Sequence, residues 1–212
     1  MIVASVMTCA GREVSLYRTL ASLRESDLRV DPIVVYDREA IEDVGLTEGH
    51  GYTRATIATR HALSLVRARV RDGDLVLFCE DDVDVNRNLR FNIETWDATA
   101  RVDLATLFYS PHLSAARIPF AGFELVDPER SSGGPCLLLS QRMIDATLDS
   151  WGRFERLGGD RQIFLAAARV LKVPVFLHRP GLVVHRPQPS ATGNPFGHIA
   201  AVEADLDWKR PV

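Results

Sequence analysis

A chain of 212 residues, 46% of them hydrophobic, can build one globular core without disulfide support. Its net charge of −3, its pI near 6.1 and its lack of a Lys/Arg block exclude a broad basic face for nucleic acid, although they leave room for a local basic groove. Three cysteines lie in or beside apolar runs, which is typical of buried free thiols in a reducing compartment. No apolar run approaches the ~20 residues of a membrane span, and the first run lacks the basic flank of a signal peptide. We therefore expect a cytoplasmic protein.

Strand-like and helix-like segments alternate through the first half of the chain. Short apolar runs rich in β-branched residues predict buried strands, and apolar residues at helical spacing predict the helices between them. This β-α-β-α-β order predicts an α/β protein with a mostly parallel sheet and helices on its faces. The expected strands are Ile2–Met7, Ile33–Tyr36 and Leu75–Cys79, and the expected helices are Glu13–Glu25, Thr53–Arg71 and Asn86–Ala98.

The second half is less regular. Residues 110–130 contain three prolines and are predicted to be mostly loop. Residues 187–197 are rich in Pro and Gly, which predicts a tail that is mobile or wrapped over the site. We expect one strand just before residue 110, Ala105–Tyr109. Between the two segments we expect the strands Cys136–Leu139, Val173–Leu177 and Leu182–Val184, and the helices Gln141–Trp151 and Arg161–Leu171.

Polar residues stand where three of the predicted strands end. Thr8 follows the first strand, Asp37 the second, and an acidic triplet, Glu80-Asp81-Asp82, the third. Because parallel sheets bind ligands beyond the carboxyl ends of their strands, one crevice can collect all of these residues.

The acidic triplet is the sharpest chemical signal. Adjacent carboxylates raise one another's pKa unless a cation compensates. A divalent ion such as Mg²⁺ or Mn²⁺, which takes oxygen ligands, is the simplest compensation. The alternative is a solvated acidic loop that caps the next helix.

Further candidates lie later in the chain. His185 ends an apolar strand, where it could complete a metal site, contact a phosphate or be structural. The neighbouring Arg186 favours an anionic ligand. Asp160 follows two glycines and precedes a helix, so it is either a general base at the mouth of a cleft or a helix N-cap.

The turn between the first strand and the first helix is another candidate. Its backbone amides at the helix start could hold an anion or a base edge. A single glycine, Gly11, is no dinucleotide fingerprint, and the chain has no Gly-rich loop ending in Lys-Ser/Thr, so Rossmann dehydrogenases and P-loop enzymes are disfavoured. Arg60, on the helix before the triplet, could pair with a diphosphate or be a surface arginine.

Taken in order, these motifs resemble the A-type glycosyltransferases over most of the chain. Departures from the family pattern are Glu80, where Asp is usual, and His61, where Asn is common. The matching segments are Met7–Arg12 as the first nucleotide-binding loop, Asp37 against the base, Arg60–Ala62 ahead of the metal motif, and Leu77–Val83 as the Asp-x-Asp strand. Later segments are Gly133–Cys136 as the acceptor-side strand, Gly158–Asp160 with the catalytic acidic residue of inverting members, and Pro180–His185 as the C-terminal stretch.

The resemblance implies a Rossmann-like, mostly parallel sheet in a single domain over residues 1–212. Residues 1–100 would bind the nucleotide sugar, 101–186 would carry acceptor and catalytic groups, and 187–212 would close over the site. Asp82 and His185 would hold Mn²⁺ or Mg²⁺, and Asp160 would be the catalytic base of an inverting transfer. The implied donor contacts are Thr8, Cys9, Ala10, Gly11, Arg12, Asp37, Arg60, Glu80 and Asp81, and the implied acceptor side holds Gly133 and Gly134.

The implied reaction moves a sugar from a nucleotide-sugar donor, such as a UDP-sugar, to an acceptor hydroxyl. The acceptor stays open among a glycan, a lipid-linked sugar, a protein side chain, a small molecule and a hydroxylated DNA base, which the acidic pI does not favour. Two other functions also stay open: a sugar nucleotidyltransferase, and a non-catalytic nucleotide-sugar-binding protein.

Overall fold

The computed structural model describes residues 1–39, 54–109, 117–118, 124–131, 134–154, 158–186 and 204–211. Its strands are β1 (Ile2–Thr8), β2 (Ile33–Tyr36), β3 (Leu75–Glu80), β4 (Val83–Val85), β5 (Leu104–Thr106), β6 (Arg117–Ile118), β7 (Glu124–Val126), β8 (Cys136–Ser140), β9 (Val175–Leu177) and β10 (Val183–His185). Its helices are α1 (Glu13–Glu25), α3 (Arg54–Arg67), α4 (Leu89–Glu94), α6 (Gln141–Ser150) and α7 (Gly159–Leu165), with a 3₁₀ turn at Thr99–Arg101 and a π-helical segment, Ala166–Leu171, continuing α7.

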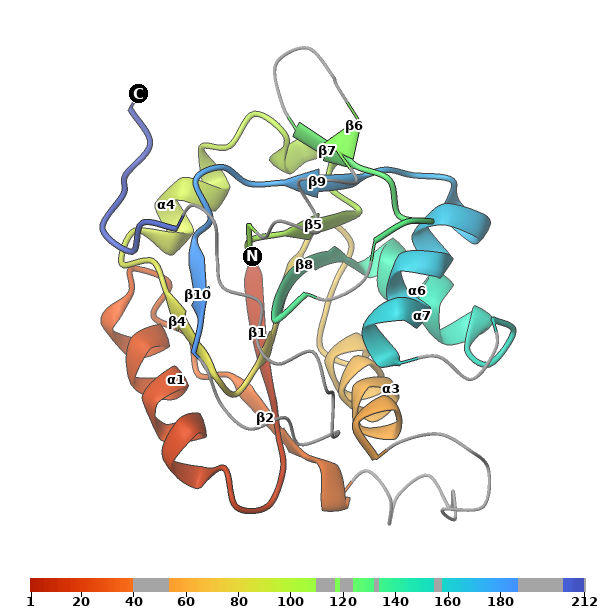
Figure 1. Ribbon diagram of the computed structural model, residues 1–212, viewed down its shortest axis with the longest axis horizontal. Helices are drawn as coiled ribbons and strands as arrows, with labels where there is room; N and C mark the ends of the chain where they lie inside the picture. The colour runs from red at the N-terminus through yellow and green to blue at the C-terminus, as the bar shows by residue number, and fades with distance from the viewer. Residues whose placement is uncertain are drawn as a thin grey trace.

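An 8-stranded mixed sheet runs through the molecule in the order β2-β1-β3-β8-β5-β9-β7-β6 (Figure 1). β1 pairs in parallel with β2 and β3, whereas β8 inserts antiparallel between β3 and β5. β7 and β8 run opposite to the rest of the sheet. The prediction of an α/β fold with a mostly parallel, helix-flanked sheet is confirmed.

Alternation along β3 divides the core between the two faces of the sheet. Val76 and Phe78 pack with residues of α3, α6 and α7, whereas Leu77 and Cys79 pack with residues of α1 and α4. Figure 1 shows these two groups of helices on opposite sides of the sheet. Because β3 is covered on both faces, it is apolar up to its last residue, Glu80.

The first half of the chain matches the sequence analysis closely. α1 and β2 have the predicted bounds, and β1 and β3 each run one residue further, so that Thr8 and Glu80 are themselves the last residues of strands. The prediction of a helix over 86–98 was too long. α4 begins only at Leu89, where the Asp27 carboxylate accepts hydrogen bonds from the amides of Arg90 (2.7 Å) and Phe91 (3.0 Å).

Three short strands were not predicted. β4 follows the acidic triplet directly and pairs antiparallel with β10 in a separate two-stranded sheet. β6 and β7 occupy part of the stretch expected to be mostly loop. Each has at most three residues, too few for a periodic pattern to be recognised. β4 and β7 also depend on partners that are distant in sequence, β10 and β9.

The end of the chain lies along β4 and α4. The Asn86 side-chain amide donates to the carbonyls of Asp205 (2.7 Å) and Trp208 (3.0 Å), and the Arg87 amide donates to Leu206 O (2.8 Å). The predicted closing tail falls partly on residues 187–203, which lie outside the described residues; residues 204–211 are anchored at the end of β4 remote from the triplet. In the described parts of the chain, no helix has the length and apolar character to cross a membrane.

Candidate functional site

The carboxyl ends of β1, β2 and β3 bring the predicted polar residues to one edge of the sheet. Thr8 pairs with Tyr36, so Asp37 follows directly beside it, and Met7 pairs with Glu80. Burial is the main cause that raises the pKa of the Cys9 thiol, and the charges of Asp81 and Asp37 raise it further. Cys9 therefore lies near both carboxylates.

The side chains of Arg12 and His185 bridge the acidic triplet. Arg12 Nε lies 3.1 Å from Asp81 Oδ1, and Arg12 Nη2 donates to Asp82 Oδ2. His185 Nε2 lies 3.0 Å from the other oxygen of Asp82 and 3.7 Å from Glu80 Oε2. Asp81 also accepts a hydrogen bond from the Thr8 hydroxyl at 2.5 Å. Asp82 is thus held from both sides, by arginine on one oxygen and imidazole on the other.

Glu80, Asp82 and His185 form a group with the chemistry of a metal site. One ligand atom of each lies within 4.8 Å of the others. Two carboxylates with an imidazole suit Mn²⁺ or Mg²⁺, which favour oxygen ligands and accept nitrogen in varying degree. The sequence analysis proposed Asp82 and His185 as ligands and gave Glu80 to the donor; the structure brings Glu80 to the same group. β10 causes this, because its pairing sets His185 opposite Val83.

The protonation equilibria reflect an excess of negative charge. Burial and the charge of Asp82 raise the pKa of Glu80, although 47% of its side-chain surface is exposed. Burial opposes ionisation of Asp82, but the hydrogen bond and charge of His185, together with Arg12, outweigh it and lower the Asp82 pKa. Burial likewise opposes protonation of His185, and Asp82 and Glu80 outweigh it and raise the His185 pKa. A divalent cation would relieve this excess.

The turn after β1 contacts the acidic triplet through the Arg12 side chain rather than through its backbone amides. Gly11 has φ +83°, a left-handed conformation that favours glycine, and the turn directs the Arg12 side chain to the triplet. However, the Gly11 amide donates to Glu13 Oε1 (3.1 Å) and the Arg12 amide to Cys9 O (3.3 Å). These two amides are therefore engaged within the turn rather than presented to an anion as the sequence analysis suggested.

Asp160 lies in the first turn of α7, two residues beyond the N-cap position. The N-cap is Gly158, so the interpretation of Asp160 as an N-cap is wrong. At Gly159 a Cβ would come within 2.2 Å of Thr59 Oγ1, which means that only glycine lets α7 begin this close to α3. The charge of Asp160 contributes to the raised pKa of Glu80, so the two carboxyl groups lie near each other.

The remaining predicted residues are Arg60, Gly133 and Gly134. Arg60 is half-buried on α3, next to Thr59, and has no ion pair with any other residue in the described part of the chain. Gly133 lies outside the described residues. Gly134 precedes Pro135, whose carbonyl accepts the Glu80 amide at 2.8 Å, so this segment borders the triplet.

Arg186 behaves differently from the expectation that it would favour an anionic ligand. Its side chain is buried, with the residue only 5% exposed, and its guanidinium donates to main-chain carbonyls and to Asp84. The interpretation as an anion contact was wrong because adjacent strand residues point to opposite faces, and His185 already faces Glu80 and Asp82. Strand alternation was the signal that could have predicted this.

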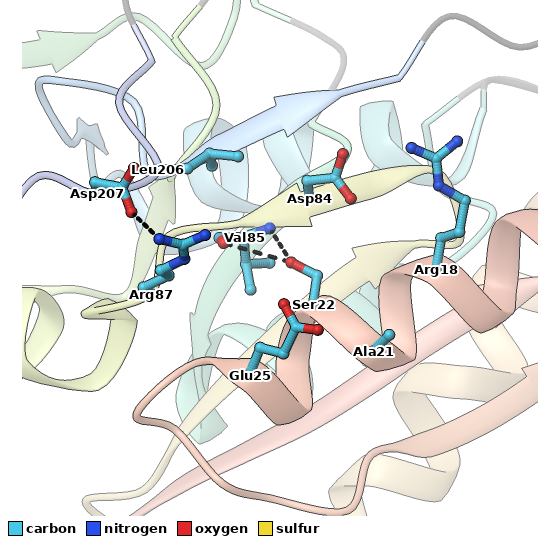
Figure 2. Close-up of a pocket in the computed structure, with 9 residues that line it drawn as sticks. All are labelled: Arg18, Ala21, Ser22, Glu25, Asp84, Val85, Arg87, Leu206 and Asp207. Carbon is cyan, nitrogen blue, oxygen red and sulfur yellow. Dashed lines mark hydrogen bonds and ion pairs between the residues drawn. The ribbon is translucent and has the colours of Figure 1, made fainter.

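A cavity of about 370 Å³ lies elsewhere, between α1, the outer edge of β4 and residues 206–207 (Figure 2). Arg18 and Glu25 on α1 and Arg87 beyond β4 line it, with Asp207 bound to Arg87 at 2.8 Å. Neither Asp160 nor any member of the Glu80, Asp82 and His185 group lines it. The candidate metal group and this cavity are therefore separate features.

No protein-family model matches the chain, and no curated protein matches it either. Solved structures do. S. aureus TarS residues 1–349 in complex with UDP-GlcNAc superposes with a TM-score of 0.58 at 14% identity, over 92% of this chain and 61% of that one. The same fragment in complex with UDP superposes with a TM-score of 0.56 at 13% identity, over 89% of this chain and 61% of that one. The fold is that of the A-type glycosyltransferases.

The A-type fold does not by itself decide the reaction. A candidate glucose-1-phosphate thymidylyltransferase from Bacillus anthracis also superposes, with a TM-score of 0.51 at 9% identity, over 87% of this chain and 89% of that one. The chain spans about 61% of the TarS fragments solved with UDP and with UDP-GlcNAc. Identities this low carry the fold alone, so the activity must be argued from the site.

Proposed function

We propose that the protein is a metal-dependent glycosyltransferase that moves a sugar from a nucleotide-sugar donor, a UDP-sugar, to an acceptor hydroxyl. One observation carries the proposal. Ligand atoms of Glu80, Asp82 and His185 gather within 4.8 Å at the carboxyl ends of the strands, in a fold shared with a protein solved with UDP-GlcNAc. Ligands in open α/β sheets bind at this edge.

The donor lies over the ends of β1 to β3 in this proposal. Residues 8–11 and Asp37 flank the base and ribose, and Arg12 and Arg60 supply positive charge for the diphosphate. Asp81 orients Arg12 and Thr8, to which it is already bonded. Arg12 can serve the diphosphate because its guanidinium is near the triplet and not fully buried.

Glu80, Asp82 and His185 are the residues proposed to hold Mn²⁺ or Mg²⁺. A bound divalent ion neutralises charge on a departing nucleoside diphosphate as a Lewis acid. The protein's own part is to keep three ligand side chains converged. Asp82 is 1% exposed and is held on both oxygens, so its orientation is set before any ligand arrives.

Asp160 is the proposed catalytic base, and the transfer is proposed to invert the anomeric centre. A single displacement needs one carboxylate on the acceptor side to take the proton of the acceptor hydroxyl. Close packing of Gly159 on Thr59 supports the assignment, since it fixes the start of α7. Gly133 and Gly134 would border the acceptor, which is a glycan, a lipid-linked sugar, a small molecule or a hydroxylated DNA base. Closure of residues 187–197 over the bound donor stays a prediction.

A donor screen tests the proposal. UDP-, GDP-, TDP- and CMP-sugars are incubated with the protein and Mn²⁺, and slow hydrolysis to free sugar is followed. We expect turnover of a UDP-sugar that EDTA abolishes and Mn²⁺ restores. Full activity in EDTA would contradict the metal assignment.

A second candidate is a sugar nucleotidyltransferase, which the thymidylyltransferase neighbour favours because the match covers 89% of that chain. Such an enzyme joins a sugar phosphate to a nucleotide and releases pyrophosphate. Pyrophosphate release from a nucleoside triphosphate, with no hydrolysis of any nucleotide sugar, would favour it. A non-catalytic binding protein would bind donor with metal and turn over neither.

A further inference from the structure

One buried residue, Arg186, donates hydrogen bonds to three consecutive carbonyls of the acidic turn. Arg186 donates from its main-chain amide to Asp82 O (2.7 Å), from Nη2 to Asp81 O (3.1 Å) and from Nη1 to Val83 O (2.8 Å). Three consecutive carbonyls of the turn are thus fixed by one side chain and its own amide. Charge-assisted hydrogen bonds of this kind are stronger than neutral ones.

Thr19, on α1, completes this support. Its hydroxyl lies 2.7 Å from Asp81 O and 2.9 Å from Val83 O, and it accepts hydrogen bonds from the Val83 amide (3.2 Å) and Arg186 Nη2 (2.8 Å). Arg186 also donates to Ser15 O (2.9 Å) and to the Asp84 carboxylate. A plain ion pair with Asp84 would need only one of these bonds, so most of the guanidinium's bonding capacity goes to backbone and to Thr19.

Strand alternation puts the two functions of β10 on opposite sides. His185 faces Asp82 and Glu80, while Arg186 reaches behind the turn toward α1. One strand therefore sets both a ligand and the backbone from which the opposing ligand, Asp82, projects. A shift of this backbone would change the distance between Asp82 and His185.

We infer that Arg186, together with Thr19, is a positioning residue that fixes residues 81–83 so that Asp82 and His185 converge on one metal ion. The inference rests on the proposed function. Loss of groups that orient metal ligands costs ~10–100-fold in metal affinity. Arg186 touches neither substrate nor metal in this role; it acts through the main chain of the turn.

A matched pair of substitutions on α1 tests the inference. Thr19→Val removes the hydroxyl beneath the turn and keeps the shape of the side chain. Ser22→Ala removes the equivalent hydroxyl one helical turn later. This hydroxyl accepts a hydrogen bond of 2.8 Å from the amide of Val85, which lies beyond the acidic turn (Figure 2). Mn²⁺ binding to the donor-free protein is titrated by electron paramagnetic resonance, and the thermal midpoint of each variant is recorded.

We expect Thr19→Val to weaken Mn²⁺ binding by about tenfold or more and to change the Mn²⁺ spectrum, and Ser22→Ala to leave both within about twofold of wild type. Arg186→Lys, which keeps the charge but not the fork of donors, should also lose at least about tenfold. If Arg186→Lys fails to fold, the α1 pair still decides the question.

Equal Mn²⁺ affinity in the Thr19 and Ser22 variants, or losses that only follow their thermal midpoints, would overturn the positioning role. A wild-type protein that binds no Mn²⁺ would instead refute the metal site, and the inference with it. The two failures are therefore distinguishable in one titration.

Discussion

The short β4–β10 ladder has a charged end, at the acidic triplet, and an opposite end that we call neutral because its buried hydrogen bonds join uncharged groups. At the charged end the Arg186 amide donates to Asp82 O, and Arg12 and His185 are shared among Glu80, Asp81 and Asp82. At the other end the Asn86 amide donates to Leu182 O (2.8 Å), and the Asn86 and Asn92 side chains fasten the C-terminal segment through carbonyls such as Trp208 O.

The two ends differ in how completely their buried polar groups are satisfied by partners within the protein. Asn86 is fully buried, and both its amide nitrogen and its amide oxygen are hydrogen-bonded to neutral groups. At the charged end Arg12 and His185 are shared among three carboxylates, and burial together with the charge of Asp82 raises the pKa of Glu80. A fully satisfied network rigidifies a structure, whereas an unbalanced one is ready to accept a further cation.

The largest expected effect is that of Asp82→Asn at the charged end. It keeps the shape of the side chain but removes the charge shared by Arg12 and His185. We expect donor turnover to fall on the order of a thousandfold and Mn²⁺ affinity on the order of a hundredfold. Asp207→Asn, at the neutral end, is the control for loss of one acidic charge and should leave both unchanged. Single-turnover kinetics and Mn²⁺ titration check this; near-normal turnover in Asp82→Asn would remove the basis for a metal site.

Asp160→Asn comes next and separates catalysis from stability. Because Gly158 is the N-cap of α7, the variant should melt near the wild type and bind donor normally. Without a proton acceptor the rate should fall on the order of a hundredfold. Rates on matched donor and acceptor, with the anomeric configuration of the product read by NMR, measure this. A product that retains the donor's configuration would argue against Asp160 as the base of an inverting transfer.

Arg12→Gln should divide donor binding from metal binding. The guanidinium supplies charge for a diphosphate, so donor affinity should fall by about tenfold. The same group competes for Asp82, so Mn²⁺ affinity without donor should stay the same or rise. Calorimetry with UDP and with Mn²⁺ measures both. Arg87→Gln, whose exposed ion pair with Asp207 lies at the neutral end, should change neither. Parallel losses of both ligands in Arg12→Gln would mean that Arg12 is structural.

The smallest effect on activity is expected from His178, which lies before β10 on the neutral side. Burial lowers its pKa from 6.5 to about 4, and Nδ1 lies 2.8 Å from Pro180 O. The unfolded chain therefore binds a proton more readily between about pH 6.5 and pH 4, so stability falls as the pH drops through this window. From about pH 7.5 to pH 5 the loss from this group is about 2 kcal/mol.

Urea unfolding of the wild type and of His178→Gln at the two pH values isolates this contribution. Other groups also titrate, so the test is the difference between the proteins, with the variant less sensitive to acid. Identical pH dependence in both would show that His178 is not the buried neutral histidine inferred here. The activity of folded His178→Gln near pH 7.5 should be unchanged.

Local pattern alone predicted β1, β2, β3, α1 and α3. Buried parallel strands are predominantly apolar, and β1, β2 and β3 each end at or just before a polar residue, so Thr8, Asp37 and the triplet could be assigned to one edge of the sheet. The same logic selected Asp82, His185 and Asp160 as candidates, because unusual polar residues at strand ends and helix starts are visible in a single sequence.

Only the tertiary structure decided how these candidates combine. Whether Glu80 joins Asp82 and His185 depends on the pairing of β10 with β4. The two strands are separated by about half the chain, and β4 is too short to be recognised from periodicity. The burial of Arg186 depends on α1 covering the turn from behind, with Ser15 and Thr19 as its partners. A sequence records which polar groups are present, but the partner of each is set by long-range packing, which determines whether a buried charge faces a ligand or a carbonyl.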